Sequence, residues 1–249
     1  MILRRLTQNL KEQNWTAITI EFVLLVVGVF LGIQVANWNE ERADLAREAV
    51  YLASLAKDIR SDIADMDEIN RVSTLRMSAM GYLIEQAAGV SLPSGFDSAR
   101  GRIEIEPSPP YAADDANTIG IAMFILTTLD GNRLAYDTII NSGGIGIIRD
   151  DTLVRAIQAY YSHVDKVLTF EAAMEINRVK LIDAQQQAGL SPVDAMSAAQ
   201  IANAFQNDPA LLAAAKNYWL YTNRHLKLMK DLRALAERVV ADIAQGSAR

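Results

Sequence analysis

The sequence predicts an all-α protein, in which one apolar N-terminal helix continues into an extramembrane antiparallel bundle of long helices, with short accessory helices and one Pro-rich loop. Residues 17–36 form an apolar run that could only be buried or surrounded by lipid. Four of the six prolines lie between Pro93 and Pro110, which predicts one irregular insert. Three long segments carry apolar residues at helical spacing: 38–88, 151–187 and 209–245.

The apolar run predicts a transmembrane helix over residues 15–38. Twenty residues at the helical rise span about 30 Å, the thickness of a bilayer's hydrocarbon core. Trp15 and Trp38 flank the run, where indole rings favour the two membrane interfaces. The alternatives are a core helix of a soluble protein and a cleaved signal peptide. A signal peptide is disfavoured because the run is long and Gln34 stands where a small residue should precede cleavage after Ala36.

The tail of residues 1–14 predicts the orientation. It carries Arg4 and Arg5 and forms an interfacial helix against anionic headgroups, with these arginines as anchors. Arg42 and Arg47 lie beyond the other end of the span, so basic residues alone do not decide the topology. A short tail is easier to retain than to export. We therefore expect a single-pass protein of the bacterial inner membrane, with a cytoplasmic N-terminus and residues 39–249 in the periplasm.

One face of the membrane helix is predicted to pack on another helix. At about 100° per residue, Glu21, Gly28 and Gly32 lie on the same side. Two glycines four residues apart let helices approach closely, and a carboxyl group inside a bilayer usually faces protein. The other interpretation is that the glycine spacing is accidental and Glu21 reaches a nearby interface. Both stay open, and the expected partners are lipid and other transmembrane helices, either copies of this chain or a larger complex.

Residues 38–88 predict a long amphipathic helix, which either continues the membrane helix or is separate from it. A heptad pattern marks its buried face: Leu45, Leu52, Leu55, Ile59, Ile63, Met66 and Ile69. The other face is acidic: Asp58, Asp62, Asp65, Asp67 and Glu68. These carboxylates could bind a divalent cation, but a solvated face is the favoured interpretation.

The middle of the chain is expected to be irregular. Residues 89–117 read as a loop with a short strand near 102–106, and this loop is the leading candidate for a contact surface. Residues 118–129 predict a core helix and residues 133–141 a short helix. The glycines at 143–146 favour a helix end and reversal over a phosphate-binding loop, because they follow a helix and no Lys-Ser/Thr pair is present.

Local signals place the last helices. Asp150 is predicted to cap a helix over 151–187, Ser191 a short helix to about 205, and Asp208 a helix to about 245. The apolar stripe of the first comprises Val154, Ile157, Tyr161, Val164, Leu168, Ile176, Val179 and Ile182. The seam of the last comprises Tyr218, Thr222, His225, Met229, Leu232, Ala236, Val239 and Ile243.

The composition is poor in histidine and cysteine, two residues that catalytic sites commonly use. The net charge of −6 disfavours nucleic acid as a partner, and the absence of cysteine removes thiolate chemistry. His163 and His225 have no neighbouring ligands at metal spacing, and His225 reads as a hydrogen-bonded core histidine. No catalytic triad or carboxylate pair can be nominated. We therefore predict no enzyme, with no catalytic residue, metal site or cofactor.

Two stretches resemble an uncharacterised bacterial family of single-span membrane proteins, a domain of unknown function. The first covers 21–28 and 32–41, a GxxxGIQxxNWNEE-type membrane exit. The second, residues 136–143 with 147–150 and Leu153, is similar to the family's internal motif. The resemblance implies the same architecture, with Glu21, Gln34, Asn37 and Trp38 in a shared core. It implies no activity.

The leading hypothesis is a membrane-anchored, non-catalytic interaction protein, an accessory or scaffolding subunit of an inner-membrane complex. The alternative is a periplasmic ligand-binding, sensor-like bundle that acts through a membrane partner, with a pocket lined by groups such as Tyr160, His225 or Arg224.

Overall fold

A computed structural model gives the fold. It describes residues 15–95, 105–112, 118–191, 194 and 196–246, without the side chains of 16–18. The chain divides into two compact units, Met1–Tyr51, here called unit 1, and Leu52–Arg249, here called the bundle unit. The helix α2 (Trp15–Ala88) contributes to both, so the apolar run and the amphipathic segment after it belong to one continuous helix.

In the described part of unit 1, α2 is a single helix with an exposed apolar surface. Every described side chain from Thr19 to Ala43 is exposed. The large apolar side chains between Phe22 and Val35 are each 45–65% exposed. Among the described residues, this is the one helix long and apolar enough to cross a membrane, and none of its apolar window is buried.

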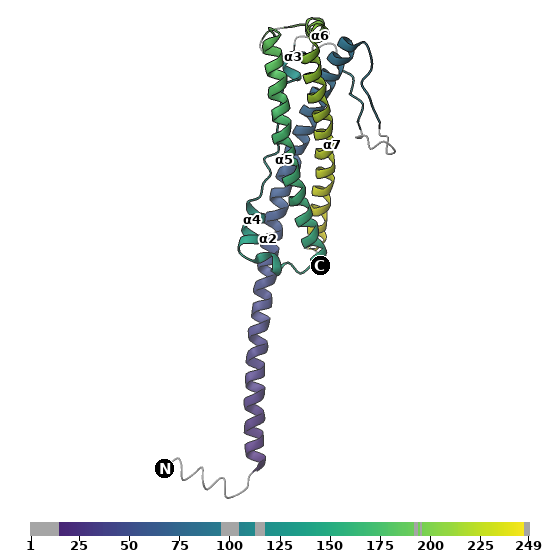
Figure 1. Ribbon diagram of the computed structural model, residues 1–249. Helices are drawn as coiled ribbons and strands as arrows, with labels where there is room; N and C mark the ends of the chain where they lie inside the picture. Colours follow the sequence, from purple (N-terminus) through teal and green to yellow (C-terminus); the bar gives the residue numbers. More distant parts are fainter. Residues whose placement is uncertain (1–14, 96–104, 113–117, 192–193, 195, 247–249) are drawn as a thin grey trace. The chain divides into compact units, whose positions relative to one another are not determined.

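The bundle unit consists of three long helices packed side by side (Figure 1). These are the Leu52–Ala88 part of α2, α5 (Asp151–Gln187) and α7 (Pro209–Gly246). Four short elements accompany them: α3 (Ile119–Ala122), α4 (Leu134–Asn141), the 3₁₀ turn η3 (Gly144–Ile147) and α6 (Ala198–Asn207). The described residues contain no strand beyond an isolated bridge between Gly95 and Ile105. The all-α prediction is confirmed.

The three long helices do not alternate in direction. Tyr160 of α5 contacts Asp62 of α2. About three turns further along both helices, Glu171 of α5 and Ser73 of α2 contact the same residue, His225 of α7. Helices α2 and α5 are therefore parallel, and α7 runs back against both (Figure 1). The parallel pair needs a returning connection, which residues 125–133, here called the strap, provide between α3 and α4.

Residues 118–129 are mostly not the predicted core helix. Only Ile119–Ala122 is helical, and residues 125–133 belong to no helix or strand. Several apolar side chains of this stretch are nonetheless buried, among them Ile119, Met123 and Leu129, whereas Ile121 is 52% exposed. Helix formation fails here because side chains of α2 and α5 bind the backbone groups that a helix would have paired internally.

Helix starts follow the local capping signals. The Asp150 carboxylate accepts the N–H groups of Thr152 and Leu153, and Asp208 caps α7 in the same way, both as predicted. For α6 the predicted start was wrong. Its cap is Ser197, which forms a capping box with Gln200, six residues beyond Ser191.

The buried seams agree with prediction in α7 and differ in α5. All eight predicted seam residues of α7 are buried. In α5, Ile176 is 58% and Val179 43% exposed. The buried row instead repeats at intervals of mostly three and four residues: Leu153, Ile157, Tyr160, Val164, Val167, Glu171, Met174, Leu181 and Gln185. Of the heptad positions predicted in α2, Leu52, Leu55, Ile59, Met66 and Ile69 are buried and Ile63 is half-buried, whereas Leu45 of unit 1 is 44% exposed.

Candidate functional site

The predicted packing face of the membrane helix is open in unit 1. Glu21, Gly28 and Gly32 are exposed on α2, and a Cβ built on either glycine meets nothing within 4 Å. The indole rings of Trp15 and Trp38 are 70% and 57% exposed. Arg4 and Arg5, the other predicted anchors, lie outside the described residues.

Trp38 is additionally covered on one face by a neighbouring cation. The guanidinium carbon of Arg42 lies 5.0 Å from the centre of the Trp38 ring. A cation over an indole is favourable and places charge and aromatic ring at one level of the helix. That combination suits a membrane interface, where one end of the side-chain pair is apolar and the other hydrated.

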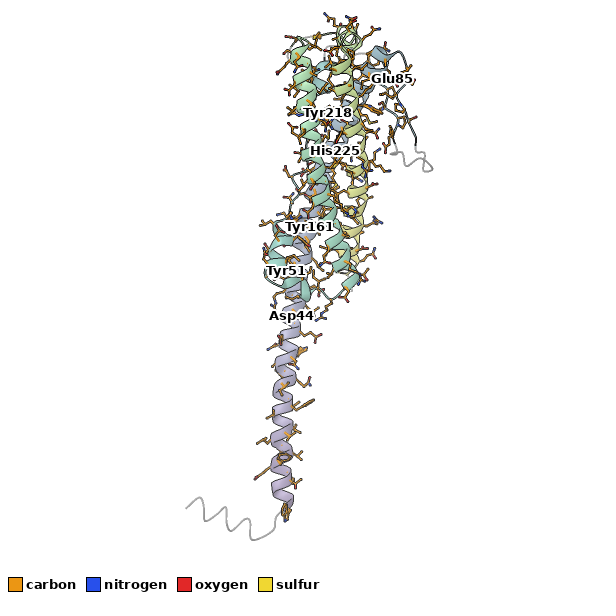
Figure 2. The ribbon with its side chains drawn as sticks, in the orientation of Figure 1. Asp44, Tyr51, Glu85, Tyr161, Tyr218 and His225 are labelled. Carbon is orange, nitrogen blue, oxygen red and sulfur yellow. The ribbon has the colours of Figure 1, made fainter. Side chains whose placement is uncertain are left out.

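A chain of polar side chains crosses the interior of the bundle unit. Arg76 donates from Nη2 to Ser73 Oγ (3.1 Å), and Ser73 Oγ lies 3.4 Å from His225 Nδ1. His225 Nε2 lies 2.8 Å from Glu171 Oε1. All four residues are at most 4% exposed. Figure 2 shows His225 between the long helices, as predicted for a core histidine.

These contacts have a self-consistent arrangement of protons. A neutral His225 that carries its proton on Nε2 donates to the Glu171 carboxylate and accepts the Ser73 hydroxyl proton at Nδ1. Ser73 Oγ in turn accepts from the Arg76 guanidinium. The chain thus runs from one buried cation to one buried anion, and each of these contacts pairs a donor with an acceptor. This balance is what makes burial of both charges tolerable.

The same charged groups hold the strap. Arg76 Nη1 donates to the Ile125 carbonyl, and the backbone N–H of Leu129 donates to both oxygens of Glu171 at 3.1 and 3.2 Å. Near its end, Gly131 adopts a φ of 66°, and a Cβ there would lie 3.2 Å from a methyl carbon of Val164 on α5. Side chains of α2 and α5 therefore supply hydrogen bonds to the strap backbone, which in a sheet would come from a neighbouring strand.

A second buried polar cluster, around Asp62, binds the C-terminal end of the strap. Asp62, predicted on a solvated acidic face, is fully buried. It accepts from the Tyr160 hydroxyl at 2.6 Å and from the backbone and side-chain nitrogens of Asn132 at 2.9 and 3.0 Å. Asp58 accepts from an N–H in the first turn of α4, that of Ala135. The solvated interpretation was wrong for Asp62 because it lies on the seam. Asp67 and Glu68 do lie on the exposed side.

Ser73, His225 and Glu171 include the atom types of a hydrolase triad, an arrangement the sequence did not reveal. Ser73 is 1% exposed, and its hydroxyl lies between Arg76 and His225. Its hydrogen bonds therefore join groups of the protein interior to one another. Within the described residues, no group of three or more His, Asp or Glu side chains could hold a metal ion.

The described cavity lies elsewhere, at the end of α2 where the predicted loop begins. Its volume is about 290 Å³. The lining is Ile84, Ala88, Val90, Ser91, Leu92, Pro93, Ile105, Lys216, Asn217, Trp219 and Leu220. The residues predicted to line a pocket do not contribute: Tyr160 and His225 are fully buried, and Arg224 is exposed.

Loop residues that wall this cavity are tied to the helices. The backbone N–H of Leu92 donates to Glu85 at 2.8 Å (Glu85 is labelled in Figure 2). The side-chain amide of Asn223 binds the N–H and the carbonyl of Glu106, at 3.2 and 2.7 Å, as a neighbouring strand would. Lys230 pairs with the Glu106 carboxylate at 2.5 Å. The described part of the loop predicted as a contact surface is thus held against α2 and α7 by hydrogen bonds and an ion pair.

Gly81→Ala is expected to displace this wall. A Cβ at Gly81 would lie 2.4 Å from Ser108 Oγ and 2.6 Å from Ser108 Cβ, and the Trp219 indole donates to the same Ser108 at 2.8 Å. Overpacking of this kind costs about 1–3 kcal/mol. Trp219 fluorescence should shift to longer wavelength as the indole loses its partner. Gly81→Ala/Ser108→Gly removes the atoms that clash and should recover most of the lost unfolding free energy in chemical denaturation, and failure to do so would contradict the contact.

Burial raises the pKa of Tyr160, Tyr161 and Tyr218 above the ordinary value of 10. As the pH rises past 10, the unfolded chain loses these protons before the folded one does, so stability falls. The expected loss is about 1.4 kcal/mol per pH unit for each tyrosine. Chemical unfolding measured between pH 9 and 11 checks it. Tyr161→Phe, whose hydroxyl has no hydrogen-bond partner in the described structure, should keep stability at neutral pH and reduce this slope.

Comparison with known proteins gives one match. The family described as "Family of unknown function (DUF6090)" matches residues 21–95. The match covers the apolar run, the rest of α2 and the start of the loop. No curated protein and no solved structure matches the chain. The chain is thus similar over this region to a family without an assigned activity.

Proposed function

We propose that the protein is a single-pass, membrane-anchored, non-catalytic interaction protein, an accessory or scaffolding subunit of an inner-membrane complex. The observation that carries the proposal is the surface of α2 in unit 1. A row of large apolar side chains, each about half exposed or more, is stable only in lipid or against another apolar surface. The interfacial tryptophans at both ends support lipid.

The open glycine face supports a helical partner in the membrane. Since a Cβ at Gly28 or Gly32 meets nothing, a second helix can approach the α2 backbone there, with Glu21 as a polar contact. Purification from native membranes in mild detergent tests this. Gly28→Leu/Gly32→Leu should release a co-purifying protein or dissociate a dimer, while Val23→Leu/Phe30→Leu on the opposite side should not. A wild-type monomer with no companion would contradict the proposal.

The proposed topology places the bundle unit in the periplasm. The chain has no cysteine, so one introduced thiol reports one position without background. Ala213→Cys, at an exposed position on α7, should react with a membrane-impermeant maleimide in intact cells with a permeable outer membrane. Gln8→Cys should react only after the inner membrane is opened. The reverse pattern would invert the proposed orientation.

Ligand binding by the bundle unit is a second candidate, favoured by the apolar cavity beside Trp219. A pocket with a mostly apolar lining and a few polar groups is the usual form of a small-molecule site. It would make the bundle unit a sensor-like domain that acts through a membrane partner.

A further inference from the structure

We propose that the cavity binds a single-chain amphiphile with a carboxylate head, its tail on the apolar lining and its head at Lys216 and Asn217. The inference rests on the ligand-binding candidate and does not depend on the membrane anchor. It concerns residues of the bundle unit alone.

The volume selects a small, apolar occupant. An apolar cavity of about 150 Å³ accepts a benzene-sized molecule, so 290 Å³ accommodates a medium-length hydrocarbon chain and not a two-chain lipid. Trp219 and Ile84 form part of a dry inner wall at 3% and 0% exposure, whereas Val90 is 66% exposed. An apolar tail that covered Val90 would remove this surface from water.

The wall is built before any ligand arrives. Glu85 fixes Leu92, and Asn223 fixes both backbone groups of Glu106, next to the lining residue Ile105. Gly95 and Ile105 pair their backbones at 2.9 and 3.3 Å. A preformed wall reduces the ordering cost of binding.

Charge selects the head group. Lys216 is an exposed cation of the lining and forms no ion pair with any described residue. The nearby acids are engaged, since Glu85 holds Leu92 and Glu106 pairs with Lys230. An ammonium from Lys216 and an amide N–H from Asn217 are donors that suit the two oxygens of a carboxylate. A cationic or neutral head would leave Lys216 without a counter-charge.

The indole in the lining supplies the assay. The full-length chain with Trp15→Phe/Trp38→Phe keeps Trp219 as its sole tryptophan and is held in an amphipathic polymer. It is titrated with 10,11-dibromoundecanoate, whose bromines quench indole fluorescence on contact. The comparison probe is the alcohol of the same chain length. We expect saturable quenching by the acid and binding at least about tenfold weaker for the alcohol, the equivalent of one charge-assisted contact.

Variants separate head from tail. Lys216→Met should weaken the acid about tenfold and leave the alcohol unchanged, and Lys216→Arg should retain the acid. Lys180→Met, at an exposed lysine on α5, is the matched control and should have no effect. Ala88→Phe should fill the cavity and abolish quenching by both probes. Circular dichroism checks that each variant is folded.

Each of the other possible results would overturn a defined part of the proposal. Equal affinity for acid and alcohol, or no effect of Lys216→Met, would overturn the carboxylate head while leaving ligand binding in place. Quenching by neither probe, or quenching that persists in Ala88→Phe, would overturn both the inference and the ligand-binding candidate. The membrane proposal would be untouched, because Lys216, Lys180 and Ala88 all lie in the bundle unit and the Trp15→Phe/Trp38→Phe background is common to every sample.

Discussion

Val26→Arg/Val27→Arg is expected to abolish stable membrane association. Both valines lie near the middle of the apolar run, at 47% and 45% exposure in unit 1. An arginine at the centre of a membrane helix costs about 2.5–3.5 kcal/mol on insertion scales, so two cost about 5–7 kcal/mol. Membranes washed with alkaline carbonate should retain the wild type and release the variant, or the variant should be degraded.

The matched control uses the same helix and the same change. Leu45 and Val50 are apolar, 44% and 63% exposed, and lie beyond the predicted span. Leu45→Arg/Val50→Arg should remain in the washed membranes because an arginine outside the hydrocarbon core carries no such cost. If both double variants behave alike, residues 17–36 are not what holds the protein to the membrane.

Arg76→Met is expected to destabilise the bundle unit by about 3–5 kcal/mol. The substitution keeps much of the side-chain volume but leaves the Ile125 carbonyl without a buried donor. It also leaves the Glu171 carboxylate buried without a compensating cation, and losing one partner of a buried charge pair has this magnitude. Equilibrium chemical unfolding followed by near-ultraviolet circular dichroism measures the change.

Two further variants test whether the loss in Arg76→Met comes from its buried charge. Arg71 is an exposed arginine five residues earlier in α2 and pairs with Glu68, so Arg71→Met should cost far less stability than Arg76→Met. Arg76→Met/Glu171→Gln removes both the buried cation and the buried anion of the polar chain. This double variant should lose less stability than the sum of its single variants, by about 1–3 kcal/mol. Strict additivity would show that the two charges do not compensate each other.

Features that depend on neighbouring residues could be predicted from the sequence. Asp150 and Asp208 cap their helices because the carboxylate reaches N–H groups two and three residues ahead, whatever the rest of the fold does. The α7 seam was correct because its heptad pattern is unbroken. The α6 cap was misplaced because Ser191 and Ser197 carry similar local signals, and only Ser197 has Gln200 in reach.

The buried polar chain was missed although a signal was present. Asp62, Ser73 and Arg76 follow the buried row of α2 at intervals of three and four residues, with the same exposure as its leucines. Glu171 occupies the corresponding row of α5. A charged residue in register with a seam indicates a buried partner, but the sequence cannot supply the partner, since Ser73 and His225 are 152 residues apart.

The strap and the cavity could not be predicted. The strap forms no helix because Arg76 and Glu171, distant in sequence, bind its backbone. Its first residues, Ile125 and Leu126, are apolar and would suit a helix equally well. Beside the cavity, Gly81 allows Ser108 to lie against α2 and to accept from the lining residue Trp219, a contact that leaves no periodic pattern. Both are consequences of tertiary contacts.

The central claim is that the early turns of α2 lie in lipid, and depth-resolved quenching tests it most directly. Three single-tryptophan variants of the full chain, retaining Trp15, Trp38 or Trp219, are reconstituted in vesicles whose lipids carry bromine near the head group or deep in the acyl chain. The account predicts strong quenching of Trp15 and Trp38 by the shallow bromines, and none of Trp219 by either. Unquenched Trp15 and Trp38, or quenching equal to that of Trp219, would contradict it.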